Sequence, residues 1–178
     1  MNKPKFLYHA SPKNNLEVLE PRAESLPGDW KDGDAVFATI SPEYASFFIV
    51  STKDVWALMG NIGGVFYFVC ADKERFLRED DGGTVYKLLS ETFIHYKGYE
   101  WYSRESVKPV GKTYIKSGLD FMIESGVQVY FLDEKTFEKI TISRDNGAGI
   151  MNNVESENEK RGLKVKKLDI YKRRKNNK

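Results

Sequence analysis

The sequence predicts an α+β domain that contains more strand than helix, and two observations support this class. Short runs of aromatic and β-branched residues recur along the chain, separated by glycine, proline or polar residues, as is typical of strands. Apolar residues recur at helical spacing in only a few short segments. The chain has 178 residues, of which 40% are hydrophobic and 13% aromatic, so it can bury a core.

Strands are expected wherever a dense apolar run ends at a turn residue. The densest run is VFYFVCAD, residues 65–72, and it predicts a central strand. Further strands are expected at residues 6–9, 35–40, 84–90, 92–97, 99–104 and 127–132, with extended segments at residues 16–21 and 107–115.

Helical spacing is clearest in residues 41–50, SPEYASFFIV. Ser41 is a favourable N-cap, Pro42 suits the first helical position, and the aromatic residues that follow fall on one helical face. Residues 54–60 are expected to extend or follow this helix. Other helical segments are expected at residues 119–126, which end at a glycine, and at residues 134–140.

Two stretches are too polar to contribute much to a core. Residues 21–34, PRAESLPGDWKDGD, are rich in glycine, proline and aspartate, which predicts a long loop of the kind that often has a function. After Ser143 the chain is polar and lacks an apolar period, which predicts a segment without regular structure. We therefore expect one domain over residues 1–143 and a polar, basic tail over residues 144–178.

The charge is unevenly distributed along the chain. The formal net charge is only +2, yet ten lysines and arginines, with Asp169 as the single acid, lie from Lys160 onward. A basic terminus of this kind is either a solvated tail or an electrostatic contact to phosphate backbones. Nucleic acid is the partner that the second interpretation implies for the tail, and the sequence leaves both interpretations open.

The cysteine and histidine content bounds the cellular setting and the metal chemistry. The chain has one cysteine, Cys70, and two histidines. One cysteine cannot form an internal disulfide, which favours a reducing, cytoplasmic location, and so few ligands argue against a zinc site. The N-terminal residues lack the apolar core of a signal peptide, and no apolar run is long enough to span a bilayer. The sequence leaves the oligomeric state open.

Three short motifs combine residue types that suit a nucleotide ligand. His9 ends the strand FLYH. Phe37 lies in a strand–turn–helix unit, VFATISPEYASFF, which continues with further aromatic residues. Glu100 opens the aromatic strand YEWYSR. Together, the three motifs resemble the ADP-ribosyltransferase fold, and within it the His-Tyr-Glu group related to diphtheria toxin.

The resemblance covers most of residues 6–132 in the order of its elements, and it implies both a fold and an activity. The implied fold is a split β-sheet core with a few short helices. The implied activity is transfer of ADP-ribose from NAD, as substrate, to a protein or nucleic-acid acceptor that the sequence does not identify. His9 would hold the nicotinamide-side ribose, and Glu100 would be the catalytic carboxylate. The other ligand contacts that the resemblance implies are Phe37 and Phe48, or its neighbour Phe47, around the nicotinamide ring, with Tyr8, Thr39 and Tyr44.

These residue types suit the implied chemistry. Cleavage of the bond between nicotinamide and ribose develops positive charge on the sugar, and a carboxylate stabilises that charge and can activate an attacking hydroxyl. The nicotinamide ring of NAD is cationic, so aromatic faces attract it. A histidine can form a hydrogen bond with a ribose hydroxyl.

Other interpretations of the same residues stay open. The family prefers tyrosine at the stacking positions, where this chain has phenylalanine. Viewed alone, His9 and the phenylalanines fit a packed core, and Glu100 fits the polar side of an alternating strand. RNA 2′-phosphotransferases share the architecture but rely on several arginines, for which only Arg22 and Arg104 are candidates near a motif. A non-enzymatic binding module of the same fold, acting through the basic tail, is the alternative from another class.

Overall fold

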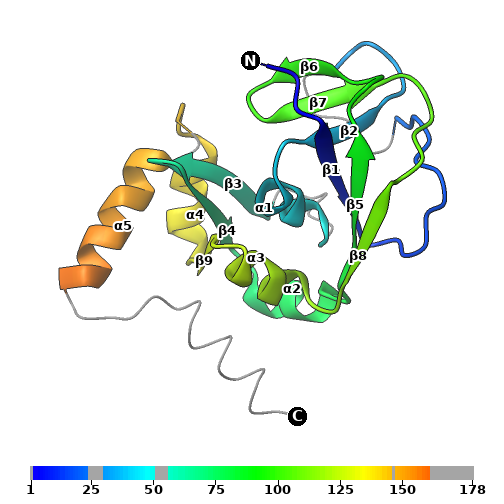
Figure 1. The fold of residues 1–178 in the computed structure, drawn as a ribbon. Coiled ribbons are helices and arrows are strands. Elements are labelled where there is room, and N and C mark those ends of the chain that lie inside the picture. The colour runs from blue at the N-terminus through cyan, green and yellow to red at the C-terminus, as the bar shows by residue number, and fades with distance from the viewer. Residues whose placement is uncertain (1, 24–29, 51–55, 146, 161–178) are drawn as a thin grey trace. The chain divides into compact units, whose positions relative to one another are not determined.

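The computed structural model describes residues 2–23, 30–50, 56–145 and 147–160 (Figure 1). The chain divides into two compact units. Unit 1 comprises residues 1–50 and 81–118, and unit 2 comprises residues 51–80 and 119–178. Two sheets and several short helices confirm the α+β class. The boundary expected after residue 143 stays a prediction.

Unit 1 is built on a six-stranded sheet with the strand order β6-β7-β2-β1-β5-β8 (Figure 1). Each strand pairs with its neighbours in antiparallel fashion. All strands predicted for this unit are present, and β8 lies within the predicted extended segment. The strands are β1 (Phe6–Ser11), β2 (Val36–Thr39), β5 (Gly83–Leu89), β6 (Ile94–Lys97), β7 (Glu100–Ser103) and β8 (Gly111–Ile115).

Strand alternation gives this sheet two different faces. One face carries buried apolar side chains such as Leu7, Leu88 and Trp101, which form the core of the unit together with residues from the connecting segments. The opposite face carries Tyr8, Thr39 and Glu100, because these residues are register partners on adjacent strands. We call this second side the Glu100 face.

The predicted helix after β2 is present but short. Its first turn is α1 (Pro42–Ala45), and the Ser41 side chain accepts a hydrogen bond from the Tyr44 backbone amide at 3.1 Å, which confirms the predicted N-cap. The chain then tightens into the 3₁₀ turn η1 (Ser46–Phe48), where the Ser46 hydroxyl donates to the Glu43 carbonyl at 2.6 Å.

Unit 2 contains a three-stranded sheet of order β3-β4-β9, and helices surround its core. The predicted central strand is β4 (Val65–Cys70), which pairs with antiparallel β3 (Ala57–Ile62) and parallel β9 (Gln128–Phe131). The predicted helices near residues 119–126 and 134–140 are confirmed. The helices are α2 (Lys73–Glu79), α3 (Gly118–Glu124), α4 (Glu134–Thr141) and α5 (Ala148–Lys160).

The prediction of a helix at residues 54–60 is wrong for residues 57–60, which belong to a strand. Residues 54 and 55 lie outside the described part of the chain. Residues 57–62 form β3, whose last residue, Ile62, pairs with Val65. Gly63 and Gly64 have φ angles of 56° and 89°, so they form the two-residue turn of a β-hairpin. Pairing with β4 overrides the weak helical pattern of this stretch.

The expectation that the chain lacks regular structure after Ser143 is also wrong, because α5 lies in this stretch. The Asp145 carboxylate accepts hydrogen bonds from the backbone amides of Gly147 and Gly149 at 3.0 and 2.9 Å, which satisfies groups at the helix start. Met151 is 1% exposed and belongs to the core of unit 2. A few apolar residues are therefore enough to anchor this polar helix.

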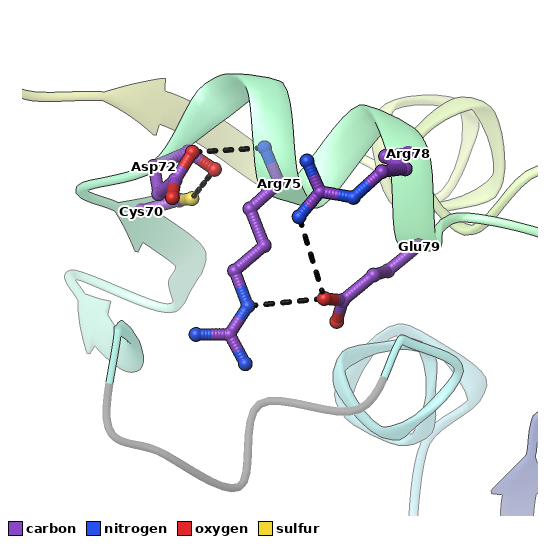
Figure 2. Close-up of polar contacts among 5 residues, drawn as sticks. All are labelled: Cys70, Asp72, Arg75, Arg78 and Glu79. Atoms are coloured by element: carbon purple, nitrogen blue, oxygen red, sulfur yellow. Dashed lines mark hydrogen bonds and ion pairs between the residues drawn. The ribbon is translucent and has the colours of Figure 1, made fainter.

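Cys70 ends β4 in a buried site beside the start of α2 (Figure 2). Its Sγ donates to the Asp72 carbonyl at 3.2 Å, and the Asp72 carboxylate caps α2 by accepting from the Arg75 amide at 2.8 Å. Arg75 Nε then pairs with Glu79 at 3.0 Å along the helix. Burial raises the pKa of the Cys70 thiol to about 12, so the side chain is a small apolar core residue.

We predict that Cys70 does not react with thiol reagents in the folded protein. With a pKa of about 12, about one thiol in ten thousand is ionised at pH 8, and the thiolate is the reactive form. Ellman's reagent should label the protein rapidly in concentrated urea, and in buffer only at the rate of unfolding. Complete labelling of the folded chain within the mixing time would contradict this assignment.

The start of β5 depends on a glycine. A Cβ atom at Gly83 would collide with the Ser11 carbonyl oxygen and lie 3.1 Å from Pro12 Cα, and both are backbone atoms. We expect Gly83→Ala to lower the free energy of unfolding by about 1–3 kcal/mol. The control is Gly111→Ala in β8, where the new Cβ would lie 3.6 Å from Lys87 Cβ and the cost should stay within about 0.5 kcal/mol. Urea denaturation compares the two, and equal stabilities would refute the close approach of β1 and β5.

Candidate functional site

The sheet of unit 1 brings the three sequence motifs onto neighbouring strands. The order β7-β2-β1 places Glu100, Phe37 and His9 on adjacent strands, although they are far apart in the sequence. Thr39 is the register partner of both Tyr8 on β1 and Glu100 on β7. The residues Tyr8, Thr39 and Glu100 therefore form one row across the Glu100 face.

His9 does not belong to this row. It follows Tyr8 in β1 and pairs in register with Tyr86 of β5, so alternation directs its Cβ to the other side of the sheet. Its ring instead turns toward β2, where Nδ1 lies 2.7 Å from the Phe37 carbonyl oxygen. His9 and Glu100 thus lie on nearby strands without sharing a face by regular alternation.

The contact from His9 lies in an open seam between β1 and β2. The ladder between these strands has a single registered pair, Tyr8 with Thr39. The Phe37 carbonyl, two residues before Thr39, faces β1 and meets the imidazole there. A backbone carbonyl can only accept a hydrogen bond, so the proton of the His9 ring is on Nδ1, which donates to the Phe37 carbonyl.

The environment of His9 favours the neutral ring. Burial lowers the pKa of His9 from its usual value of 6.5, the hydrogen bond to Phe37 acts in the opposite direction, and the charge of Arg22 lowers it further. With the proton on Nδ1, Nε2 presents a lone pair, so the hydrogen bond that it can form is with a donor, such as a hydroxyl.

Glu100 opens β7, as predicted, and its carboxylate contacts a side chain of α1. The Tyr44 hydroxyl donates to Glu100 Oε1 at 3.4 Å, and both side chains are half-buried. Burial, followed by the negative charge of Glu100, raises the pKa of Tyr44 well above its usual range. The phenol therefore stays protonated at any working pH and holds one oxygen of the carboxylate.

The candidate stacking residues have different environments. Phe47 is 2% exposed and is a core residue rather than a ligand contact, because the 3₁₀ turn directs its ring inward. Phe48 is 44% exposed, and its ring lies 6.1 Å from that of Tyr44. Phe37 is half-buried, but its ring contacts three others. We call the group Trp30, Phe37, Tyr96 and Tyr102 the aromatic cluster.

Thr39 has a structural role. It is 3% exposed, and its hydroxyl oxygen accepts a hydrogen bond from the Ser41 amide at 3.3 Å, within the turn that leads into α1. Ser103, the last residue of β7, is 1% exposed and donates to the Thr92 hydroxyl at 2.9 Å. Glu105 is exposed beyond the end of β7 and does not join the row.

The ring partners of Phe37 are not evident from the sequence. Strand alternation places Tyr102 on the side of Glu100, but nothing in the sequence shows that Phe37 packs against it. Trp30 lies in the loop before β2, where no periodic pattern indicates its direction, and its ring centroid is 4.6 Å from that of Tyr102. These contacts follow from strand register and chain reversal.

Among the residues described, no three His, Cys, Asp or Glu side chains gather closely enough to hold a metal ion. None of the helices described is both long and apolar enough to cross a membrane. No protein-family model matches the sequence, and no significant match was found among curated proteins or solved structures.

The buried state of His9 predicts a pH-dependent stability. Because its pKa is lowered from 6.5 in the folded state, its stabilising contribution is complete above pH 6.5 and is lost as the pH falls below that value. His9→Asn keeps an N–H donor for the Phe37 carbonyl but does not titrate. We expect it to reduce the stability lost between about pH 7.5 and 5.5 in urea denaturation.

The control for this prediction is the second histidine. His95 is exposed, so His95→Asn should retain the pH dependence of the unmodified protein. An identical pH dependence in both variants would show that the His9 ring is not held in the neutral form.

Proposed function

We propose that unit 1 binds NAD and transfers its ADP-ribose group to an acceptor, with Glu100 as the catalytic carboxylate. The observation that carries this proposal is the position of the three motifs on adjacent strands, with Glu100 held by Tyr44. The strand order β7-β2-β1 is not evident from the sequence, in which these strands lie far apart. It places a carboxylate, half-exposed rings and an imidazole within a few strand widths.

The roles of the residues follow from their contacts. In the transfer, the bond between the nicotinamide nitrogen and the ribose carbon breaks, and nicotinamide leaves with the electron pair. The acceptor forms a bond to the same carbon, and its proton passes to Glu100 or to water. A carboxylate that Tyr44 keeps in place can stabilise the positive sugar and receive this proton.

The neutral imidazole of His9 supports binding rather than proton transfer. Its Nδ1 proton is committed to the Phe37 carbonyl, so Nε2 can accept a hydrogen bond from a ribose hydroxyl. Phe48 and Tyr44, which lie on adjoining turns, are the rings left to contact the nicotinamide once Phe47 is assigned to the core. Phe37, a member of the aromatic cluster, is a further ring that can contact the nicotinamide.

We predict that Glu100→Gln separates chemistry from binding. The amide keeps the shape of the side chain, so NAD affinity in calorimetric titration should change by less than about threefold. Loss of the carboxylate should lower nicotinamide release, followed by chromatography, by about 100-fold or more. Glu105→Gln, a nearby exposed carboxylate, is the matched control and should behave like the unmodified protein.

The remaining outcomes distinguish the proposal from its rivals. Failure of the unmodified protein to bind NAD would refute it. NAD binding without cleavage in the unmodified protein would favour the non-enzymatic module, and cleavage that survives in Glu100→Gln would exclude Glu100 as the catalytic group.

A further inference from the structure

The Glu100 face carries aromatic and cationic side chains beyond those that the proposed NAD site uses. Phe37 and Tyr102 are register partners on β2 and β7. The centroid of Trp30 lies 5.1 Å from Phe37, 5.2 Å from Tyr96 and 4.6 Å from Tyr102, and it meets each ring edge-on. All four rings are half-buried, so each keeps part of its surface accessible.

Lysines accompany aromatic rings at both ends of this face. On β6, Lys97 Nζ lies 5.1 Å from the ring centroid of Tyr96. On the side of β5, Lys87 and Lys5 lie over the ring of Phe6, at 3.9 and 5.2 Å from its centroid. Each lysine thus presents a positive charge beside an aromatic surface.

The register aligns these groups along one row, which we call the strip, with the buried Thr39 at its centre. The row that contains Glu100 runs from β5 to β6 through consecutive register partners. With strands about 4.8 Å apart, its two terminal lysines stand about 19 Å from each other, a span longer than one nucleotide. Among the strand residues on this face, Glu100 is the single acid. The row is Lys87, Tyr8, Thr39, Glu100 and Lys97.

We propose that the Glu100 face binds single-stranded nucleic acid, with bases stacking at Tyr96 and Tyr102 and phosphates contacting Lys97 and Lys87. Partly exposed aromatic rings beside cationic groups bind single strands without strong sequence preference, because every base has a stacking surface. A duplex hides those base surfaces, and the lysines favour a polyanion over an uncharged peptide. The residues of this surface are not part of the basic tail in the sequence, and the proposal does not depend on the proposed NAD chemistry.

The test measures binding of the full chain to a fluorescent 12-nucleotide oligouridylate and to an RNA duplex of the same length, by anisotropy at low salt. Tyr102→Leu removes the stacking ring but keeps an apolar side chain, and it should weaken single-strand binding about tenfold. Tyr114→Leu is the control, because Tyr114 is 60% exposed and pairs with Thr84 on the opposite side of the sheet. The tail is the same in every variant, so its contribution cancels.

A second pair of variants avoids any effect on packing. Lys97→Glu reverses an exposed charge of the strip, and Lys116→Glu reverses an exposed charge outside it. Lys97→Glu should weaken oligonucleotide binding more than Lys116→Glu, and it should also reduce the salt dependence of the affinity more. Circular dichroism melting confirms that each variant is folded.

Several results would overturn the proposal. Unchanged oligonucleotide affinity in both Tyr102→Leu and Lys97→Glu would assign binding to the tail. Equal affinity for single strand and duplex would exclude base stacking, and absence of any binding would exclude the surface altogether. A dimer in sedimentation that Tyr102→Leu dissociates, with oligonucleotide affinity unchanged, would instead assign the face to a second copy of the chain. Glu100→Gln removes the single acid of the row, so it should strengthen oligonucleotide binding while it lowers NAD cleavage. The two readouts therefore move in opposite directions, which distinguishes failure of this proposal from failure of the NAD proposal.

Discussion

The four-residue strand β2 is the constraint on which the site of unit 1 depends. It pairs with β7 along its whole length but with β1 at the single position Thr39. The Ile40 amide donates to the Tyr99 carbonyl, so the polar groups of alternate residues face β7, and those of Phe37 and Thr39 face β1. Because the ladder to β1 stops at Thr39, the Phe37 carbonyl needs another partner. The His9 imidazole supplies it, so the sheet stays continuous while a side chain enters its seam.

Hydrogen bonding at the seam also determines what the site can offer a ligand. An unpaired buried carbonyl costs free energy, so the contact to Phe37 orients the His9 ring and determines which nitrogen carries the proton. Tyr44 has a similar effect on Glu100, since a protonated phenol beside a carboxylate restricts the positions of its oxygens. The two polar groups are thus preorganised by local contacts from β2 and α1, which is the property that both binding and catalysis require.

The two proposals use different parts of one sheet. The NAD proposal draws on the seam and the Tyr44–Glu100 contact, and the nucleic-acid proposal draws on the rings and lysines that flank Glu100 on the same face. Lys97 is the register partner of Glu100, so its positive charge offsets part of the repulsion between this carboxylate and a polyanion. The same face can therefore present a negative group to a sugar and positive groups to phosphates.

Local sequence pattern determined much of the fold. Dense apolar runs gave the strands of both sheets, Ser41 and Pro42 gave the start of α1, and Glu100 was expected at the start of its strand, because these features depend on neighbouring residues. Residues 57–62 and 148–160 were misread, since one is a strand through its pairing with β4 and the other a helix anchored by Met151.

By itself, the sequence determined the α+β class, most element positions and the residue types available for chemistry, because alternation and capping are local properties. Only the tertiary structure decided which residues meet. Strand order placed β7, β2 and β1 side by side, and register aligned Tyr8, Thr39 and Glu100. The open seam turned His9 toward the Phe37 carbonyl, and packing assigned Phe47 to the core. These outcomes depend on pairing between distant segments, which one-residue shifts of register would reverse and which no local pattern encodes.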